Sequence, residues 1–176
     1  NIIENHDQPR GASLFIPEED YGFYSLSALA TIIFCERGLP FLYQGQEIGM
    51  SNRQWKYDEF NDLETINQYQ IALKAGMSKE QALEIARHHS RDNARTPMQW
   101  SSEENAGFSK GKPWMPVNEN YKVVNVAEEE KEYGSILNFY KRLIAFYKSE
   151  EYNEILTYGD FRPIYEKEDH IFAYSR

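Results

Sequence analysis

Cysteine is nearly absent from this 176-residue chain, since Cys35 is the only one and lies in an apolar run. A lone thiol excludes a disulfide framework and a cysteine-based metal cluster within the chain. The apolar run predicts a buried structural cysteine. Because free thiols are typical of reducing compartments, we also expect a cytoplasmic protein. The sequence also lacks any apolar run of about 20 residues, so we expect no membrane-spanning segment and no membrane partner.

Basic residues are scarce as well: 19 Lys and Arg stand against 28 Asp and Glu, which leaves a net charge of −9. Domains that bind nucleic acids usually present a basic face to the phosphates, so we expect no nucleic-acid partner. A neutral ligand such as a sugar is compatible with an acidic chain. The hydrophobic fraction of 41% is ordinary for a globular protein and argues against disorder.

A polar cluster that contains His6 and Asp7 follows two β-branched residues at positions 2–3. β-branched residues favour extended backbone, and Pro9 cannot donate to a sheet ladder, so the sequence predicts a strand that ends near Asp7. In parallel α/β sheets and barrels, the carboxyl ends of the strands carry the chemistry. His6 and Asp7 are therefore candidate site residues. A polar turn formed by Asn5 and Asp7 is the alternative.

Two further segments complete a βαβ unit with this opening strand. Residues 25–36 have apolar side chains on nearly every face, and Gly38 follows them, which predicts a buried helix that ends before the glycine. Residues 39–43 form a short apolar run between Gly38 and Gly45, which predicts a buried parallel strand.

The long stretch after the second strand, residues 46–132, has no strong strand signal. It is too long for a simple loop, so we expect an inserted subdomain that is helical and irregular. Helices are predicted at residues 57–73 and 78–88, and Ser78 with Gln81 predicts a capping box at the start of the second.

The second half of the chain contains three segments of different character. Residues 91–121 are rich in proline, asparagine, glycine and aromatic residues and should be irregular but packed by their own side chains. Residues 135–148 repeat apolar side chains at helical spacing and predict an amphipathic helix. Residues 155–175 alternate polar and apolar side chains around residues 159–160, which predicts the first strands of a separate β domain.

Four segments fit one known pattern in the right order. They are residues 5–10 (NHDQPR), 38–50 (GLPFLYQGQEIGM), 91–100 (RDNARTPMQW), and 105–108 (NAGF) with 113–114 (PW) and 117–118 (VN) behind it. On these segments the sequence resembles the α-glucosidase branch of the α-amylase family of glycoside hydrolases. That branch includes oligo-1,6-glucosidase, dextran glucosidase and trehalose-6-phosphate hydrolase.

The resemblance implies an α/β fold: the C-terminal part of a (β/α)₈ TIM barrel, with about strands 7–8 and helices 7–8. A complete barrel needs roughly 250 residues, so the N-terminal part of the barrel would be a missing partner of this chain. On that pattern, residues 1–150 belong to the catalytic barrel, and residues 46–132 are its insertion after strand 8. Residues 151–176 would begin a β-sandwich C-terminal domain.

The family pattern also implies roles for individual side chains. It assigns Asp7 as the stabiliser of the transition state and His6 as the histidine that hydrogen-bonds the substrate. Arg91 matches an arginine of the pocket for the terminal glucose, with a structural ion pair as the alternative. Glu64 lies where related glucosidases contact the second sugar, although a solvated helix carboxylate is an equal expectation. Arg10 is expected to order its loop, with a sugar contact as the alternative.

Retaining hydrolysis of a glycosidic bond needs a carboxylate nucleophile and a carboxylic acid. In the family both come from earlier strands, and neither matches a position in this sequence. We therefore expect part of a retaining α-glucosidase that releases terminal α-linked glucose from short α-1,6 or α-1,4 oligosaccharides, with the chain inactive when alone. The alternatives are a trehalose-6-phosphate hydrolase, a sucrose isomerase or transglycosylase, and a non-catalytic barrel like the ectodomain of the amino-acid-transporter heavy chains.

Two further expectations follow from the same resemblance. We expect no cofactor and no metal in this chain, while a calcium site elsewhere in the full-length protein stays open. Arg95 is a weaker candidate for the pocket than Arg91, because arginines also brace loops of this kind.

Overall fold

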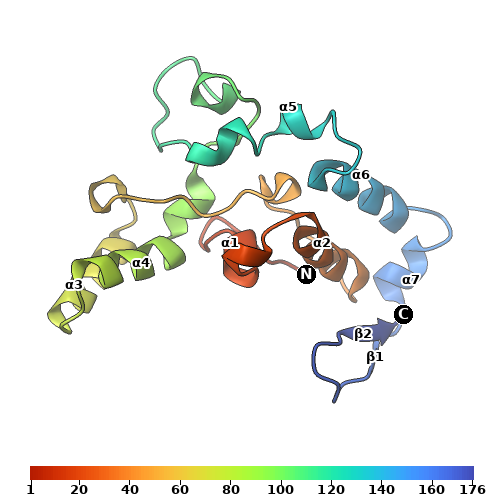
Figure 1. The fold of residues 1–176 in the computed structure, drawn as a ribbon. Helices are drawn as coiled ribbons and strands as arrows, with labels where there is room; N and C mark the ends of the chain where they lie inside the picture. Colours follow the sequence, from red (N-terminus) through yellow and green to blue (C-terminus); the bar gives the residue numbers. More distant parts are fainter.

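Helices and short turns make up most of the computed structural model, which describes residues 1–176 (Figure 1). Helices α3 and α4 lie at one end of the molecule, and α7 lies with a β hairpin at the other. The elements are α1 (Gly11–Phe15), α2 (Phe23–Cys35), α3 (Leu63–Lys74), α4 (Lys79–His89), α5 (Val126–Glu129), α6 (Ile136–Tyr147), α7 (Asn153–Tyr158), β1 (Arg162–Ile164) and β2 (Ala173–Ser175). None of the helices is long and apolar enough to cross a membrane.

The two predicted parallel strands, at residues 2–7 and 39–43, do not form. The segments touch at one register position, where the Asn1 amino group donates to Leu39 O (2.6 Å) and Phe41 N–H donates to Asn1 O (2.9 Å). This is the bonding pattern of a parallel pair. The second segment is also not buried, since Phe41 is 62% exposed. A parallel strand needs neighbours on both edges and helices on both faces, and the 176 residues supply neither in full.

The main apolar core lies between α2 and α6, the two helices predicted at residues 25–36 and 135–148. Both predictions are confirmed within two residues at each end. The Phe34 ring packs edge-on against Tyr147, with 5.7 Å between the ring centroids. The Ser135 hydroxyl caps α6 by accepting a hydrogen bond from Asn138 N–H. The buried members of the core are Ala30, Ile33, Phe34, Ile136, Tyr140, Leu143, Tyr147 and Leu156.

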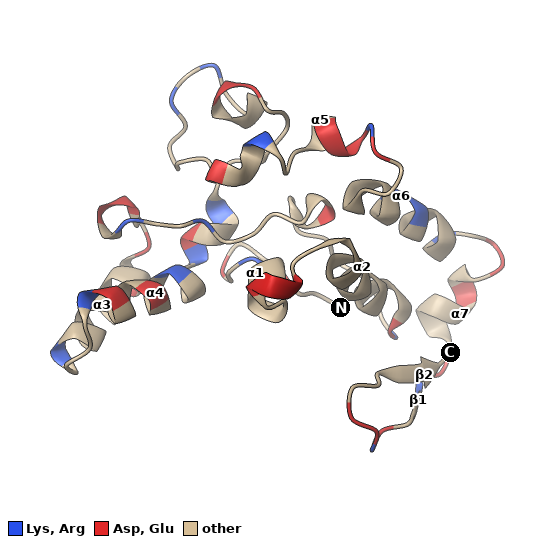
Figure 2. Ribbon diagram, in the orientation of Figure 1, with Lys and Arg blue, Asp and Glu red and all other residues tan.

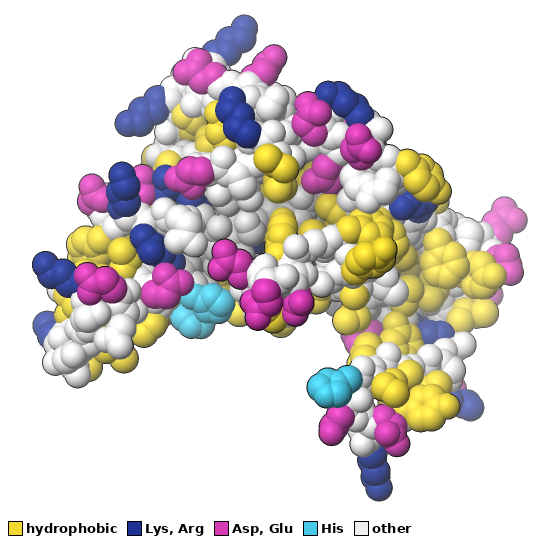
Figure 3. Space-filling view, in the orientation of Figure 1, with side chains coloured by type: hydrophobic (Ala, Val, Ile, Leu, Met, Phe, Trp, Pro, Cys, Tyr) yellow, Lys and Arg dark blue, Asp and Glu magenta, His cyan; other side chains and the backbone are white.

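One face of this core has no cover within the chain. Figure 3 shows apolar side chains gathered at the surface around α2, α7 and the hairpin. Tyr24, Phe41 and Tyr158 are among the most exposed large hydrophobic residues. Exposed apolar side chains that gather on one face are typical of a surface that another element covers.

A helical pair, α3 and α4, forms the second packed unit. The capping box predicted for Ser78 and Gln81 is present at the start of α4. The other helix begins at Leu63 and not at residue 57, because residues 57–59 form a 3₁₀ turn and Asp62 is the N-cap. Its apolar cluster consists of Trp55, Phe60, Tyr69, Ala82, Ala86 and Met115.

Residues 91–121 are irregular, as predicted, with 3₁₀ turns at Arg91–Arg95, Glu104–Gly107 and Glu119–Lys122. The first of these turns follows α4 directly and is called the arginine turn below. Its Ser90 side chain accepts a hydrogen bond from Asp92 N–H, as at the start of a helix.

The C-terminal hairpin pairs β1 with β2 in antiparallel register, with Pro163 opposite Tyr174. The expectation of strands from residue 155 onward is wrong for residues 155–158, which belong to α7. Arg176 connects these parts, because its guanidinium donates to Cys35 O (2.8 Å) and Leu156 O (2.9 Å). The proposed domain boundary at residue 150 stays a prediction.

A carboxylate at the end of α5 gives the fold a pH-dependent contact. Figure 2 shows α5 as an acidic segment, and its Glu129 Oε2 accepts a hydrogen bond from Leu137 N–H (3.0 Å) at the start of α6. Burial raises the pKa of Glu129 to about 7, the bond from Leu137 lowers it, and the charge of Glu47 raises it. The pKa in the folded protein therefore lies above the 4.5 of an ordinary glutamate.

A raised pKa in the folded state means that the bound proton stabilises the fold at low pH. This contribution is complete below about pH 4.5 and is lost as the pH rises through about 7. We expect the thermal unfolding midpoint of the full-length protein to fall between about pH 5 and 8, and to fall less in Glu129→Gln. The exposed Glu128→Gln is the matched control. Equal slopes in wild type and Glu129→Gln would contradict the prediction.

Candidate active site

Three side chains from two distant segments meet around the carboxylate of Asp7. His6 Nε2 lies 3.1 Å from Asp7 Oδ2, and Arg95 Nη2 lies 2.9 Å from Asp7 Oδ1. Arg91 Nη1 is 3.7 Å from the same Oδ1. The structure thus brings His6, Asp7 and Arg91 together with Arg95, the weaker candidate of the sequence analysis. Asp7 is 52% exposed, so its carboxylate is open to a ligand.

Arg91 is held in place by a helix cap. Its Nε lies 3.2 Å from Asp62 Oδ2, and its Nη2 lies 2.5 Å from Asp62 Oδ1, which is a bidentate ion pair. The same carboxylate accepts hydrogen bonds from Thr65 and from Glu64 N–H at the start of α3. Burial raises the pKa of Asp62, but the hydrogen bonds from Arg91 and Thr65 outweigh this effect and lower the pKa to about 2. Asp62 therefore stays ionised and orients the guanidinium.

Glu64 lies at the edge of this cluster, on the first turn of α3. Its Oε2 is 3.6 Å from Arg91 Nη2, and its Oε1 accepts a hydrogen bond from Gln68 (3.3 Å). The side chain is exposed. Its position is compatible both with a solvated helix carboxylate and with a contact to a second sugar, so its role stays a prediction.

Asp92 ties the arginine turn to the start of α3. Its Oδ2 accepts hydrogen bonds from Asn61 N–H (2.7 Å) and Asp62 N–H (2.9 Å), and the side chain is 1% exposed. Its Oδ1 has no hydrogen-bond partner, and Arg95 Nη1 lies 3.9 Å away. The partner of Arg91 is thus Asp62 and not the adjacent Asp92, which serves as an anchor for the backbone.

Arg10 does not face a sugar pocket, which corrects one of the two roles expected for it. The side chain is 0% exposed and donates to Gln44 O (2.7 Å), Asn93 O (3.3 Å) and Glu4 Oε2 (3.2 Å). Burial raises the pKa of Glu4, although the charge and hydrogen bond of Arg10 lower it. With every direction of the guanidinium enclosed, Arg10 orders the loop, and no surface is left for a substrate.

Asn93 is the buried centre of the arginine turn, and the sequence analysis missed it. Its Oδ1 accepts hydrogen bonds from Arg53 N–H (2.9 Å) and Trp55 Nε1 (2.7 Å). Its Nδ2 donates to Arg87 O (2.7 Å) and Ser90 O (3.0 Å). An asparagine amide has two donors and a carbonyl oxygen, and here all are used. The turn that carries Arg91 and Arg95 therefore rests on a rigid base.

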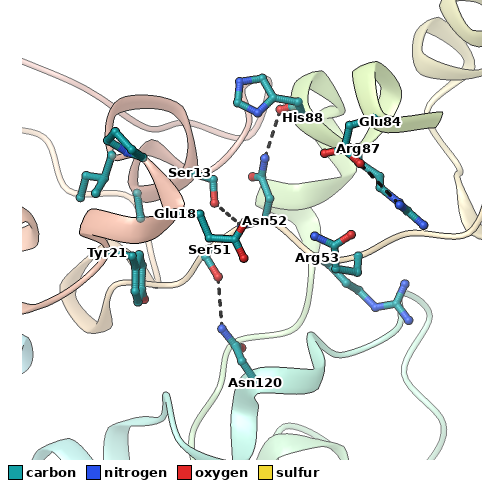
Figure 4. Close-up of a pocket in the computed structure, with 14 residues that line it drawn as sticks. Ser13, Glu18, Tyr21, Ser51, Asn52, Arg53, Glu84, Arg87, His88 and Asn120 are labelled. Carbon is teal, nitrogen blue, oxygen red and sulfur yellow. Dashed lines mark hydrogen bonds and ion pairs between the residues drawn. The ribbon is translucent and has the colours of Figure 1, made fainter. Parts of the chain in front are cut away.

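A polar hollow of about 500 Å³ lies between α1 and α4, and it contains none of the residues of the Asp7 cluster (Figure 4). Its walls are bonded to one another: Asn52 N–H donates to Ser13 Oγ (2.8 Å), and Asn120 donates to Ser51 Oγ (3.2 Å). The hollow is therefore a gap at the packing interface between structural elements. No group of three or more His, Cys, Asp and Glu side chains in the chain is arranged to hold a metal ion.

Comparison with known proteins gives consistent matches. The family model for the alpha amylase catalytic domain matches residues 1–159. An oligo-1,6-glucosidase of Parageobacillus thermoglucosidasius is 40% identical over 99% of this chain and 31% of its own length. An alpha-glucosidase of Candida albicans is 38% identical over 99% of this chain and 32% of its own. The chain thus spans about a third of the length of these relatives.

Solved structures agree with the sequence matches. A trehalose-6-phosphate hydrolase of Bacillus licheniformis superposes with a TM-score of 0.90 at 41% identity, covering 97% of this chain and 30% of that one. The trehalulose synthase MutB of Pseudomonas mesoacidophila superposes with a TM-score of 0.87 at 38% identity, covering 98% and 31%. These neighbours are TIM barrels of the alpha-amylase family, and the chain covers part of one. The assignment to strands 7–8 and the insertion stays a prediction.

Proposed function

Because the chain belongs to the alpha-amylase catalytic domain family, we propose that it supplies Asp7, His6 and Arg91 to the sugar pocket of a retaining α-glucosidase. The observation that carries the proposal is the exposed Asp7 carboxylate, which lies within ion-pair distance of His6 and two arginines. The Asp7 side chain is 52% exposed, so its carboxylate can accept hydrogen bonds from a ligand.

The chemistry of the proposed reaction explains these residue types. The transition state of glycoside hydrolysis carries positive charge on the sugar ring. A fixed carboxylate at Asp7 accepts hydrogen bonds from the sugar hydroxyls, and these bonds strengthen as the ring becomes cationic. The His6 imidazole donates a hydrogen bond to the oxygen of one of these sugar hydroxyls. Stabilisation that grows toward the transition state raises the catalytic rate constant, and not only the affinity.

The nucleophile and the general acid do not match positions of this chain, so the whole activity is a property of the full-length protein. We expect the full-length protein to release glucose from isomaltose or maltose with retention of the anomeric configuration, and the 176-residue chain alone to release none. The relatives include both hydrolases and a trehalulose synthase. Product analysis with isomaltose, maltose, sucrose and trehalose-6-phosphate separates a glucosidase from a phosphosugar hydrolase and from a sucrose isomerase.

The absence of any turnover, together with no calorimetric binding of these sugars, would contradict the proposal and favour a non-catalytic barrel. Binding without turnover would also reject the hydrolase assignment.

The Arg91→Lys variant tests the pocket directly. Lysine keeps the charge but cannot make the bidentate contact with Asp62. A hydrogen bond to a charged group contributes about 1.5 to 3 kcal/mol, so kcat/KM should fall by about ten- to a hundredfold in the full-length protein. The matched control is Arg162→Lys, an exposed arginine of the hairpin. Unchanged steady-state kinetics in Arg91→Lys would remove this residue from the proposed pocket.

A further inference from the structure

The turn that presents Asp7 receives hydrogen bonds from one side chain outside the turn, that of Arg95, and a longer ion pair from Arg91. Within the turn, Asp7 N–H donates to Asn5 Oδ1 (2.8 Å), and Asn5 Nδ2 donates to Gln8 Oε1 (3.2 Å). From outside the turn, the hydrogen bonds to residues 5–8 come from Arg95 alone: its Nε donates to His6 O (3.0 Å) and its Nη2 to Asp7 Oδ1 (2.9 Å). Arg95 is therefore the one hydrogen-bond donor that reaches the Asn5 to Gln8 turn from outside it.

Arg95 itself stands on a fixed base. The preceding residue, Ala94, is fully buried, and its carbonyl accepts a hydrogen bond from Tyr43 Oη (3.0 Å). Thr96 Oγ1 donates to Asn93 O (3.1 Å) on the other side. The second end of the guanidinium points toward Asp92 Oδ1, the buried oxygen that has no hydrogen-bond partner. The arginine turn is thus more rigid than the turn that it holds.

We propose that Arg95 is a positioning residue for Asp7, an inference that rests on the proposed function. One bond to the backbone of His6 and one to the carboxylate of Asp7 set both the height of the turn and the rotation of the carboxylate. Asp7 Oδ2 then faces His6 and stays available to a sugar hydroxyl. Arg91 has a different task, because it binds Asp62 and lies 3.7 Å from Asp7.

The geometry of its side chain makes arginine suited to this role. Its planar fork holds several N–H donors in fixed directions, so one side chain can bond a carbonyl and a carboxylate together. Lysine is a point charge on a flexible stem and cannot reproduce both bonds. A displacement of about 1 Å at a reacting group is enough to cost about a hundredfold in rate. Loss of Arg95 should therefore lower kcat far more than it raises KM.

The experiment is a double-mutant cycle in the full-length protein. Arg95→Met should lower kcat by about a hundredfold, with KM changed by less than about threefold, and Arg95→Lys should recover only part of the loss. In the Asp7→Asn background, Arg95→Met should cost less than about threefold more, because its effect passes through the missing carboxylate. The exposed Arg162→Met is the control for loss of an arginine.

Equal losses from Arg95→Met in the wild-type and Asp7→Asn backgrounds would overturn the proposal, as would a loss that follows a fall in the unfolding midpoint. A second measurement does not depend on activity. Hydrogen exchange should quicken at the amides of Asp7 and Gln8 in Arg95→Met while the amides of α6 are unchanged. Unaltered exchange at the turn would overturn the proposal that Arg95 holds it in position. If the wild-type protein is inactive but exchange quickens in Arg95→Met, the proposed function is rejected, while the hold of Arg95 on the turn is supported.

Discussion

Replacing Asp7 by Asn in the full-length protein is expected to lower kcat by about a hundred- to a thousandfold, which corresponds to about 2.7 to 4 kcal/mol of lost transition-state stabilisation. Asparagine has nearly the same shape and can still accept from one side. It lacks the negative charge that interacts with the cationic sugar ring, and its amide group donates where the carboxylate accepted. The measurement is steady-state hydrolysis of a nitrophenyl α-glucoside.

Stability is expected to change little in this variant, because the Asp7 side chain is half exposed and a surface ion pair contributes about 0 to 1 kcal/mol. The control is Asp160→Asn, another exposed aspartate that pairs with an arginine. A rate within threefold of wild type in Asp7→Asn would be incompatible with a transition-state role for this carboxylate, and the proposed function would lose its main support.

The largest expected effect on stability comes from Arg10→Met. Arg10 and Glu4 are both buried, and methionine would leave the Glu4 carboxylate enclosed without a counter-charge. Two backbone carbonyls, Gln44 O and Asn93 O, would lose a donor as well. Removing one partner of a buried ion pair costs about 3 to 5 kcal/mol. The full-length protein should therefore unfold at a clearly lower temperature or urea concentration.

The double variant Glu4→Gln with Arg10→Met separates the two parts of this loss. Gln has no charge to bury, so the double variant should be more stable than Arg10→Met alone. Arg142→Met on the exposed face of α6 is the matched control, and its midpoint should stay close to wild type. If Arg10→Met unfolds at the wild-type midpoint, Arg10 does not have the structural role that its buried contacts indicate.

The helices were predictable because their signals are local. Apolar periodicity identified residues 135–148 as a helix, and the Ser78 and Gln81 pair identified the start of α4. The strands at residues 2–7 and 39–43 were not predictable in the same way, because a parallel strand exists only through pairing with distant segments. β-branched and apolar residues favour extended backbone, but they do not supply partners.

The candidate site shows the same division. The pattern of residues at 5–10 and 91–100 predicted that His6, Asp7 and Arg91 share one site. Composition and spacing contained no signal that Asp62 is the partner of Arg91, because the two are 29 residues apart. The contact between Arg95 and Asp7 spans 88 residues and is equally invisible.

By itself, the amino-acid sequence determined the family of this protein, its main helices, and the types of side chain available at the candidate site. The tertiary structure alone decided which arginine faces solvent and which is enclosed. Arg10 and Arg95 carry the same charge, yet one is fully buried against Glu4 and backbone carbonyls while the other holds the Asp7 turn at the surface. The reason is that burial and charge pairing arise from contacts between distant segments, which no local pattern encodes.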